Sequence, residues 1–196
     1  MIVIRSFVAI EIPETIRMEL RDQIAYLKQD IPSRMVRWVR SEGIHLTLKF
    51  LGDVPFEKIN QISATLVSIC REHVSFSLNI GEFGCFPNFR RPRVLWIGVQ
   101  DLSAQLTVLQ DGIEDELDKL GFERETRCFH PHLTVGRVNR IRDRMETQQL
   151  TATLEDVKID DIGRFHVNDV SLMRSELKPT GAVYTRLVAA KLGGSE

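Results

Sequence analysis

The chain has 196 residues, which is enough for one large domain or for two small lobes that share a core. Hydrophobic residues make up 43% and charged residues 27%, an ordinary balance for a globular protein. The formal net charge of −1 excludes attraction of nucleic acid through the field of the whole molecule, so such binding would need a local patch. No run approaches the roughly 18 apolar residues of a membrane helix, so we expect no membrane segment.

The cysteines and the N-terminus indicate the compartment. Cys70, Cys85 and Cys128 are odd in number and have no CxxC spacing, which favours buried thiols in a reducing cytosol over a disulfide framework or a zinc site. The first residues are apolar, but Arg5 and Glu11 interrupt them, so they predict a strand and not a signal peptide. We therefore expect a cytoplasmic protein.

Hydrophobic periodicity predicts strands and helices that follow one another along the chain. Strands are expected at 2–12, 44–51, 74–80, 94–99, around the second motif described below, and at 157–162, 170–175 and 183–190. Helices are expected from Pro13 to Pro32, from Pro55 onward and over 102–120, with a helix or a partly helical loop over 139–155. No linker divides the chain, so we expect one bilobal α+β domain over 1–196, with halves of roughly 1–95 and 96–196.

A tetrapeptide that occurs twice organises the chain. It reads His45-Leu46-Thr47-Leu48 in the first half and His132-Leu133-Thr134-Val135 in the second. In a strand, histidine and threonine would share one face and the apolar residues the other. A single copy would match an ordinary half-exposed strand by chance. Two copies, one in each half, predict a duplicated fold in which a pseudo-two-fold axis brings both pairs to one cleft.

Two such pairs suit acid-base chemistry on a phosphodiester. Imidazole titrates near pH 6.5, so one histidine can act as general base while the other acts as general acid, each worth roughly 10²–10⁴ in rate. The threonine hydroxyls can hold charged phosphoryl oxygens. Neither pair contains a carboxylate, which disfavours a hydrolase built on Asp or Glu, and the set favours cleavage without a metal.

A zinc site is the alternative for the same region. His130 and His132 would share one strand face, and together with His45 they could form a three-histidine site. The twin threonines would then have no role, so we expect no metal.

Residues 84–93 form a loop rich in aromatic, proline and arginine residues. Its Arg90, Arg91 and Arg93 could follow the phosphates of RNA, or they could belong to a solvated loop. The following aromatic residues could stack on a base: Phe7, Trp38, Phe86, Phe89 and Tyr184. For Phe7 and Trp38, a place in the core is an equal alternative.

The chain resembles the RNA 2′,3′-cyclic phosphodiesterase family, also called 2′-5′ RNA ligase-like, of the two-histidine phosphoesterase superfamily. The resemblance covers nearly the whole chain, and the following blocks carry it: Arg5 to Ile10, Trp38, His45 to Gly52, Pro92 to Trp96, Pro131 to Arg137, and Leu177 to Tyr184. It implies two antiparallel sheets that line a central cleft, with helices outside. It also implies hydrolysis of a 2′,3′-cyclic phosphate to a 2′-phosphate without a metal or another cofactor.

The resemblance also implies roles for individual residues. His45 would donate a proton to the leaving 3′ oxygen, His132 would take one from water, and Thr47 and Thr134 would hold the phosphate. The family's further arginine falls on Arg137, although strict strand alternation would put it on the face opposite His132. Either the strand ends or bulges there, or Arg137 does not have this role.

The substrate that we expect is an RNA with a 2′,3′-cyclic phosphate end, such as a tRNA fragment, or a cyclic nucleotide, acted on by a monomer. Ligation or cleavage of 2′-5′ linked RNA and action on another cyclic nucleotide are alternatives. A different class of function is an RNA-end binder without activity. Two intact motifs favour the enzyme, because a binder would not need two titratable groups.

Overall fold

The computed structural model describes residues 2–141, 143–179 and 181–193, so Thr180 of the block Leu177 to Tyr184 lies outside the described residues. The strands are β1 (Val3–Glu11), β2 (Val36–Trp38), β3 (His45–Pro55), β4 (Phe76–Phe86), β5 (Val94–Gln100), β6 (His132–Val138), β7 (Gly163–Val167), β8 (Asp169–Lys178) and β9 (Gly181–Lys191). The helices are α1 (Glu14–Asp30), α2 (Ile59–Glu72), α3 (Gln105–Asp118) and α4 (Arg144–Glu155), with short 3₁₀ turns at Ser41–Gly43 and Phe56–Lys58.

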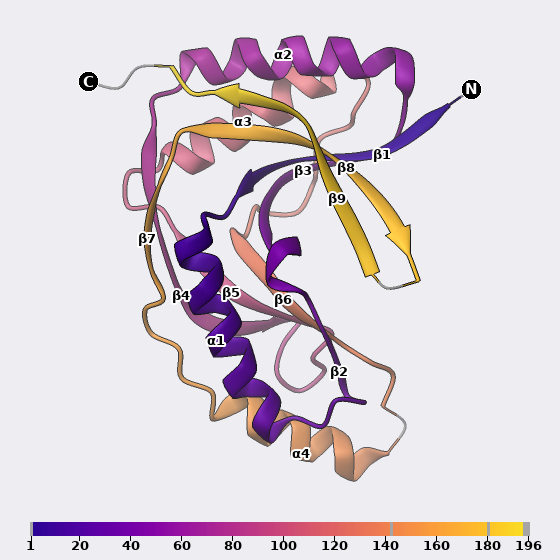
Figure 1. Ribbon diagram of the computed structural model, residues 1–196, viewed down its shortest axis with the longest axis vertical. Helices are drawn as coiled ribbons and strands as arrows, with labels where there is room; N and C mark the ends of the chain where they lie inside the picture. The colour runs from indigo at the N-terminus through magenta and orange to yellow at the C-terminus, as the bar shows by residue number, and fades with distance from the viewer. Residues whose placement is uncertain (1, 142, 180, 194–196) are drawn as a thin grey trace.

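The strands pair in the order β7-β4-β5-β6-β3-β1-β8-β9, and β2 pairs with β6 beside this path. Every pairing is antiparallel. A single pair of residues, Leu46 and Leu133, connects β3 to β6. The sheet therefore consists of two four-stranded sets that meet where the two motif strands lie side by side. This agrees with the predicted α+β fold of two antiparallel lobes (Figure 1).

The strand order is the same from both ends when β3 is matched with β6. In this matching β1 corresponds to β5, β8 to β4 and β9 to β7. The two halves of the chain also exchange strands: β4 pairs with β5 and β8 pairs with β1. Each four-stranded set therefore contains strands from both halves of the chain, as a duplicated fold with a pseudo-two-fold axis allows.

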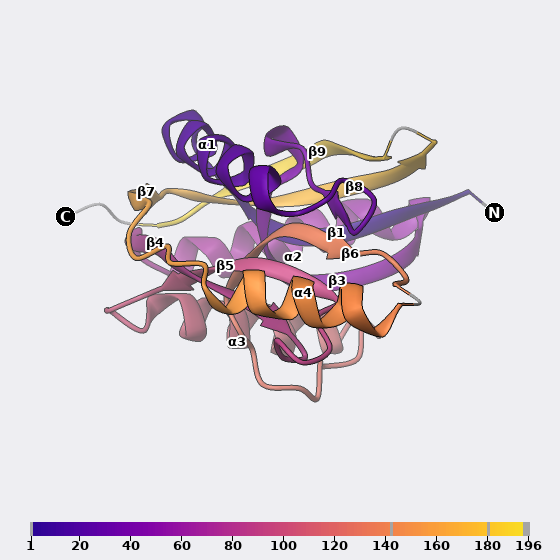
Figure 2. The same cartoon turned by 90° about the horizontal axis from the view of Figure 1, so that it is seen from below.

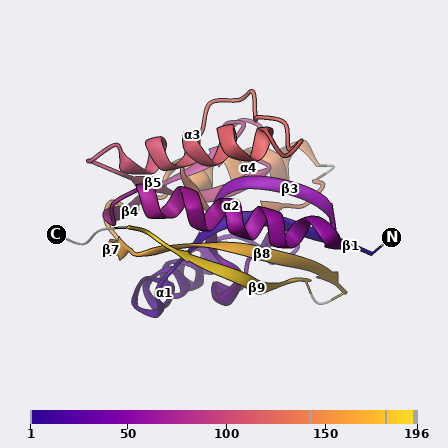
Figure 3. The same cartoon turned by 90° about the horizontal axis from the view of Figure 1, so that it is seen from above.

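A pair of helices covers each set of strands. Helices α2 and α3 pack on each other and contact β8, β9 and β3 (Figures 1 and 3). Helices α1 and α4 lie at the other end of the molecule, beside β4 and β5 (Figures 1 and 2). Their apolar stripes, such as Ile16, Leu20, Ile24 and Leu27 of α1, join one core that runs through both sets. Burial of these stripes is the main force that holds the sets together.

One sequence expectation was wrong in this part of the fold. The strand expected at 157–162 is not formed, and β7 begins at Gly163. Instead, residues 157–162 run beside the middle of β4, where Ile159 is buried and its carbonyl accepts from the Glu82 N–H at 2.8 Å. Over 139–155, the expected helix or partly helical loop takes the second form: α4 begins at Arg144, where the Asp143 side chain accepts from the Met145 N–H at 2.7 Å and caps the helix.

The expectation of buried thiols holds for Cys70 and Cys85 and is wrong for Cys128, which is exposed. Burial raises the pKa of the Cys70 thiol to about 12 and that of Cys85 to about 11, so both stay protonated at neutral pH. Among the described residues, no helix combines the length and apolar character that crossing a membrane requires.

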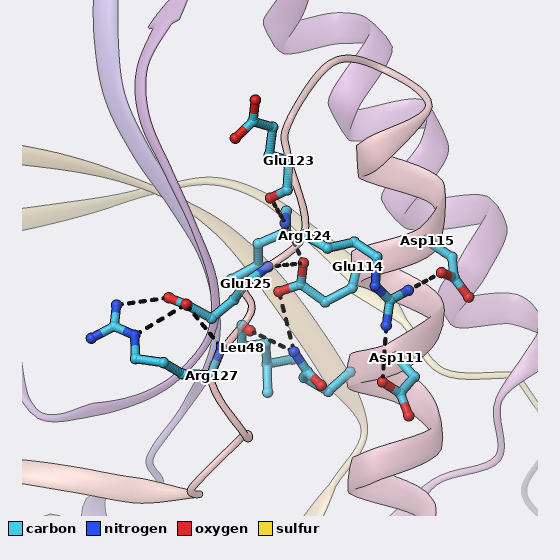
Figure 4. A network of polar contacts seen from close by, with 10 residues as sticks. Leu48, Asp111, Glu114, Asp115, Glu123, Arg124, Glu125 and Arg127 are labelled. Atoms are coloured by element: carbon cyan, nitrogen blue, oxygen red, sulfur yellow. Dashed lines mark hydrogen bonds and ion pairs between the residues drawn. The ribbon is translucent and has the colours of Figure 1, made fainter.

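A buried ion pair fixes β3 against α3. Lys49, only 4% exposed, donates to the Glu114 carboxylate and, at 2.8 Å, to the Glu123 carbonyl. The same carboxylate accepts from Gln110 Nε2 and from the Glu125 N–H, each at 3.2 Å (Figure 4). The network thus joins the strand after the first motif to the loop that leads to the second motif.

We expect Lys49→Met to lower the free energy of unfolding by about 3–5 kcal/mol, because it leaves the Glu114 carboxylate buried without a counter-charge. The double variant Lys49→Met/Glu114→Leu should recover most of this loss, since no charge is then buried. Urea denaturation followed by circular dichroism measures both. Arg127→Ala is the control, because its pair with Glu125 is exposed and its loss should leave the free energy of unfolding nearly unchanged. A loss in Lys49→Met no larger than the control's would contradict this account.

Candidate active site

The structure brings the two His-x-Thr pairs together. Both leucines that connect β3 to β6 are buried, so His45 and Thr47 project from the other face of β3, and His132 and Thr134 from the same face of β6. All four side chains are half-buried. We call this side of the sheet the motif face. The alternation in the sequence predicted this placement.

Both imidazoles are held in the same way. His45 Nδ1 lies 2.9 Å from the Gly43 carbonyl oxygen, and His132 Nδ1 lies 2.6 Å from the carbonyl oxygen of His130. A carbonyl oxygen only accepts, so each Nδ1 carries the proton and donates it. Each Nε2 is then left as the nitrogen that can accept a proton or, when protonated, give one away.

Aromatic rings surround both histidines. Phe7 stacks on His45 with ring centroids 4.6 Å apart, and Tyr184 meets the same imidazole edge-on at 4.9 Å. Phe86 meets His132 edge-on at 4.9 Å, and Trp96 lies 6.4 Å from it. These contacts limit the rotation of both imidazoles, and they place Tyr184 and Phe86 at the motif face.

Phe7 and Trp38 belong to the core and not to a base-stacking surface. Phe7 is 3% exposed and packs with Ala9, Met173 and Tyr184. Trp38 is partly buried against the main core. The sequence left two alternatives open for these residues, a place in the core and stacking on a base, and the structure supports the place in the core.

The pKa of each histidine is lowered from its usual value of 6.5. For His45, burial is the main cause, and the Gly43 carbonyl and the Glu11 carboxylate oppose it. For His132, burial is again first, and the charge of Arg137 lowers the pKa further. Each imidazole is therefore more easily deprotonated in the folded protein than in water, which suits a general base at neutral pH.

A β-bulge determines the face of β6 from which Arg137 projects. Between β5 and β6 the register shifts: Trp96 pairs with Thr134, but Leu95 pairs with Gly136, so Val135 is an extra residue. Val135 and Gly136 are both buried, and Arg137 is exposed. The bulge therefore returns Arg137 to the motif face, where its charge acts on His132.

Only part of the loop over 84–93 lies beside the histidines. Its first residues extend β4 as far as Phe86, whereas Phe89 packs against the main core and lies 6.3 Å from Phe83. Phe89 is thus not placed beside either histidine. Arg90, Arg91 and Arg93 are exposed, and none of them has an ion-pair partner among the described residues.

The geometry does not support the zinc alternative. Within 2–141, 143–179 and 181–193, no three His, Cys, Asp or Glu side chains come together as a metal site would require. His130 is exposed and faces the Phe86 ring at 6.0 Å, and its carbonyl anchors His132.

Sequence reasoning missed two neighbours of the histidines. Trp96 belongs to the block Pro92 to Trp96, which carries the family resemblance. Its ring lies near His132 because Gly84 leaves room for it: a Cβ on Gly84 would lie 2.3 Å from the indole. Glu11 pairs with His45 across β1 and β3, accepts from Ser171 Oγ at 2.6 Å and lies 3.3 Å from Arg186 Nη1. A lone glutamate at a strand end carries no signal that could have predicted this.

The comparisons with known proteins agree with this fold and geometry. The family model described as LigT-like phosphoesterase matches twice, over residues 10–96 and 97–184. An RNA 2′,3′-cyclic phosphodiesterase of Methanothermobacter thermautotrophicus is 36% identical over 191 residues, which cover 96% of this chain and 99% of the relative. Another of that name, from Thermotoga maritima, is 33% identical over 190 residues, 97% of this chain and 96% of the relative.

Solved structures show the same fold. The protein TT0787 of Thermus thermophilus superposes with a TM-score of 0.80 at 28% identity, covering 98% of this chain and 100% of that one. LigT of Escherichia coli, complexed with 3′-AMP, superposes with a TM-score of 0.77 at 25% identity, covering 97% and 99%. The chain belongs to the LigT-like phosphoesterase family.

We expect His45 and His132 to titrate below pH 6.5 with their protons on Nδ1, because burial penalises the imidazolium. Since the unfolded chain then binds more protons just below pH 6.5, both residues should stabilise the fold above that pH and lose this contribution as the pH falls. Nitrogen-15 NMR titration, assigned with His45→Gln and His132→Gln, measures the pKa values and the tautomers. Titration of both above 6.5 would contradict this.

Proposed function

We propose that the protein hydrolyses RNA 2′,3′-cyclic phosphate ends to 2′-phosphomonoesters, without a metal, by general acid-base catalysis at His45 and His132. The observation that carries the proposal is the pair of imidazoles on adjacent strands, each held by an Nδ1–carbonyl hydrogen bond with Nε2 left for proton transfer. Relatives that share about a third of the residues over nearly the whole chain are named RNA 2′,3′-cyclic phosphodiesterases, and this supports the substrate class.

The proposed reaction is an in-line displacement at phosphorus. His132 Nε2 takes a proton from water as the water oxygen bonds to phosphorus. The bond to the 3′ oxygen breaks, and His45 donates its proton to that oxygen, so the 2′-phosphate remains. Thr47, Thr134 and Arg137 would hold the non-bridging oxygens, where charge must be balanced in the transition state.

Other residues would extend the contact with RNA. Phe86 and Tyr184 stand beside the histidines and could stack on the terminal base. We keep Phe89, Arg90, Arg91 and Arg93 as proposed RNA contacts on the neighbouring loop. We further propose a cytoplasmic monomer that forms one bilobal domain over residues 1–196. The two matches of the family model support halves of roughly 1–95 and 96–196.

The test is hydrolysis of a panel of cyclic-phosphate-ended RNAs and nucleosides in the presence of EDTA. We expect EDTA to leave the activity unchanged. His45→Ala and His132→Ala should each lower turnover by roughly 10²–10⁴. Thr47→Ala and Thr134→Ala should each cost about 1.5–3 kcal/mol of transition-state stabilisation, because each removes one hydrogen bond to charge.

His166→Ala is the matched control, since this exposed imidazole on β7 bonds to Ser77 at 3.2 Å and should not affect turnover. Near-full turnover of His45→Ala or of His132→Ala would rule out the two-histidine mechanism. Loss of activity in EDTA that zinc restores would favour metal chemistry. Tight binding of cyclic-phosphate ends without any hydrolysis would instead indicate an RNA-end binder. Joining or cleavage of 2′-5′ linked RNA would indicate the alternative activity.

The pH profile tests the pairing of the histidines. Catalysis needs one neutral and one protonated imidazole, so kcat/KM should follow a bell whose two apparent pKa values belong to the pair. Because both pKa values are lowered in the free protein, the bell should be centred below pH 6.5. A bound phosphate anion raises both values, so the kcat profile should lie at higher pH. A single limb that rises past about pH 9 would indicate attack by hydroxide instead.

A further inference from the structure

Two arginines stand opposite each other at the end of the second motif strand. The short strand β2 pairs with β6 in antiparallel fashion, and Arg37 is the direct partner of Arg137. Residues that oppose each other in this way project from the same face, with Cβ atoms about 4.5–5.5 Å apart. Both side chains are exposed.

The packing of the neighbouring residues identifies the face. A Cβ on Gly136 would lie 2.9 Å from Val36 Cγ1 and 3.2 Å from Trp38 Cε3, so these two side chains of β2 lie on the core side. Arg37 stands between them in the strand and therefore projects from the opposite side. This is the motif face, to which the bulge at Val135 also returns Arg137.

The pair is without a counter-charge in the part of the chain that the structure describes. Like charges directly opposite each other in a sheet are destabilising. Among the described residues, no carboxylate lies within ion-pair distance of Arg37 or Arg137. The other arginines of the same segment do have partners: Arg34 lies 2.5 Å from Glu146, and Arg40 lies 3.9 Å from Glu42. An anion bound between the two guanidinium groups would relieve this repulsion.

We propose that Arg37, together with Arg137, binds a second phosphate of the substrate, the phosphodiester that precedes the cyclic end of the RNA. Arg137 follows the second motif on its own strand and reaches toward the cyclic phosphate. Arg37 lies one strand further out, where the next phosphate of the chain would pass. Guanidinium groups bind such phosphates through two parallel hydrogen bonds. The inference rests on the proposed function and defines its substrate as RNA of at least two nucleotides.

Three substrates test it: a nucleoside 2′,3′-cyclic phosphate, a dinucleotide with the same cyclic end, and that dinucleotide with an uncharged methylphosphonate linkage. We expect the wild-type protein to prefer the charged dinucleotide over the uncharged one by about 10- to 100-fold in kcat/KM, the value of one or two charge-assisted hydrogen bonds. Arg37→Ala should hydrolyse both dinucleotides about equally and should keep wild-type activity on the nucleoside. Arg37→Lys should restore part of the preference.

Arg34→Ala is the matched control, because it removes the same charge from the same segment at a residue already paired with Glu146. It should keep the preference for the charged linkage. A preference unchanged in Arg37→Ala would overturn the proposal, and so would an equal loss on all three substrates. Thermal unfolding gives a further check: Arg37→Ala should not unfold earlier than the wild type, since it removes a repulsion. A lower unfolding temperature would overturn the argument.

Failure of the proposed function is a separate outcome. If the wild-type protein hydrolyses none of the three substrates, the proposed activity is wrong. A binding measurement then tests the proposed phosphate site at Arg37 and Arg137. For this measurement the probes are dinucleotides that end in a 2′-phosphate, with the charged or the methylphosphonate linkage. Tighter binding of the charged one that Arg37→Ala abolishes would support the second phosphate site. Equal binding of both by the wild-type protein would overturn it.

Discussion

The single pairing of Leu46 with Leu133 determines the geometry on which the rest of the site depends. It is the one residue pair that connects β3 to β6, and both of its side chains are buried. Because one histidine precedes each leucine, this contact sets the distance between the two imidazoles. A slip by one residue would turn one histidine into the core. Helices α2 and α3 pack on one set of strands, and α1 and α4 lie at the other end of the molecule, so the core on both sides supports this contact (Figure 1).

A bulge follows each motif, and the two bulges show how the duplicated halves have diverged. In β3, Ala9 pairs with Thr47 and Val8 with Lys49, so Leu48 is the extra residue, as Val135 is in β6. The next residue turns toward the core in both halves. In β3 this is Lys49, which needs Glu114 as its counter-charge, whereas in β6 it is Gly136, which leaves room for Trp38. The residues after these, Phe50 and Arg137, return to the motif face.

Period-two alternation and repetition made the fold class and the central histidines predictable from the sequence. The bulges were not predictable, since an extra residue in a strand leaves no mark in the composition. For this reason, strict alternation placed Arg137 on the face opposite His132. The exchange of β4 and β8 between the halves was hidden as well, because pairing depends on contacts distant in the chain. A strand was wrongly predicted at 157–162 because the apolar residues there, among them the buried Ile159, follow the pattern of a strand. Thr47, Thr134 and the histidine roles stay predictions until variants are assayed.

The surroundings of the two histidines are unequal, and this inequality favours distinct roles for them. The Glu11 carboxylate opposes the lowering of the His45 pKa, whereas the Arg137 guanidinium adds to the lowering of the His132 pKa. Ser171 and Arg186 hold the carboxylate in place, and the β6 bulge turns Arg137 toward the motif face. In the proposed mechanism, the Glu11 charge would favour the proton on His45, the proposed donor. His132 would then be neutral beside the attacking water, the arrangement that the proposed opening of the cyclic ester requires.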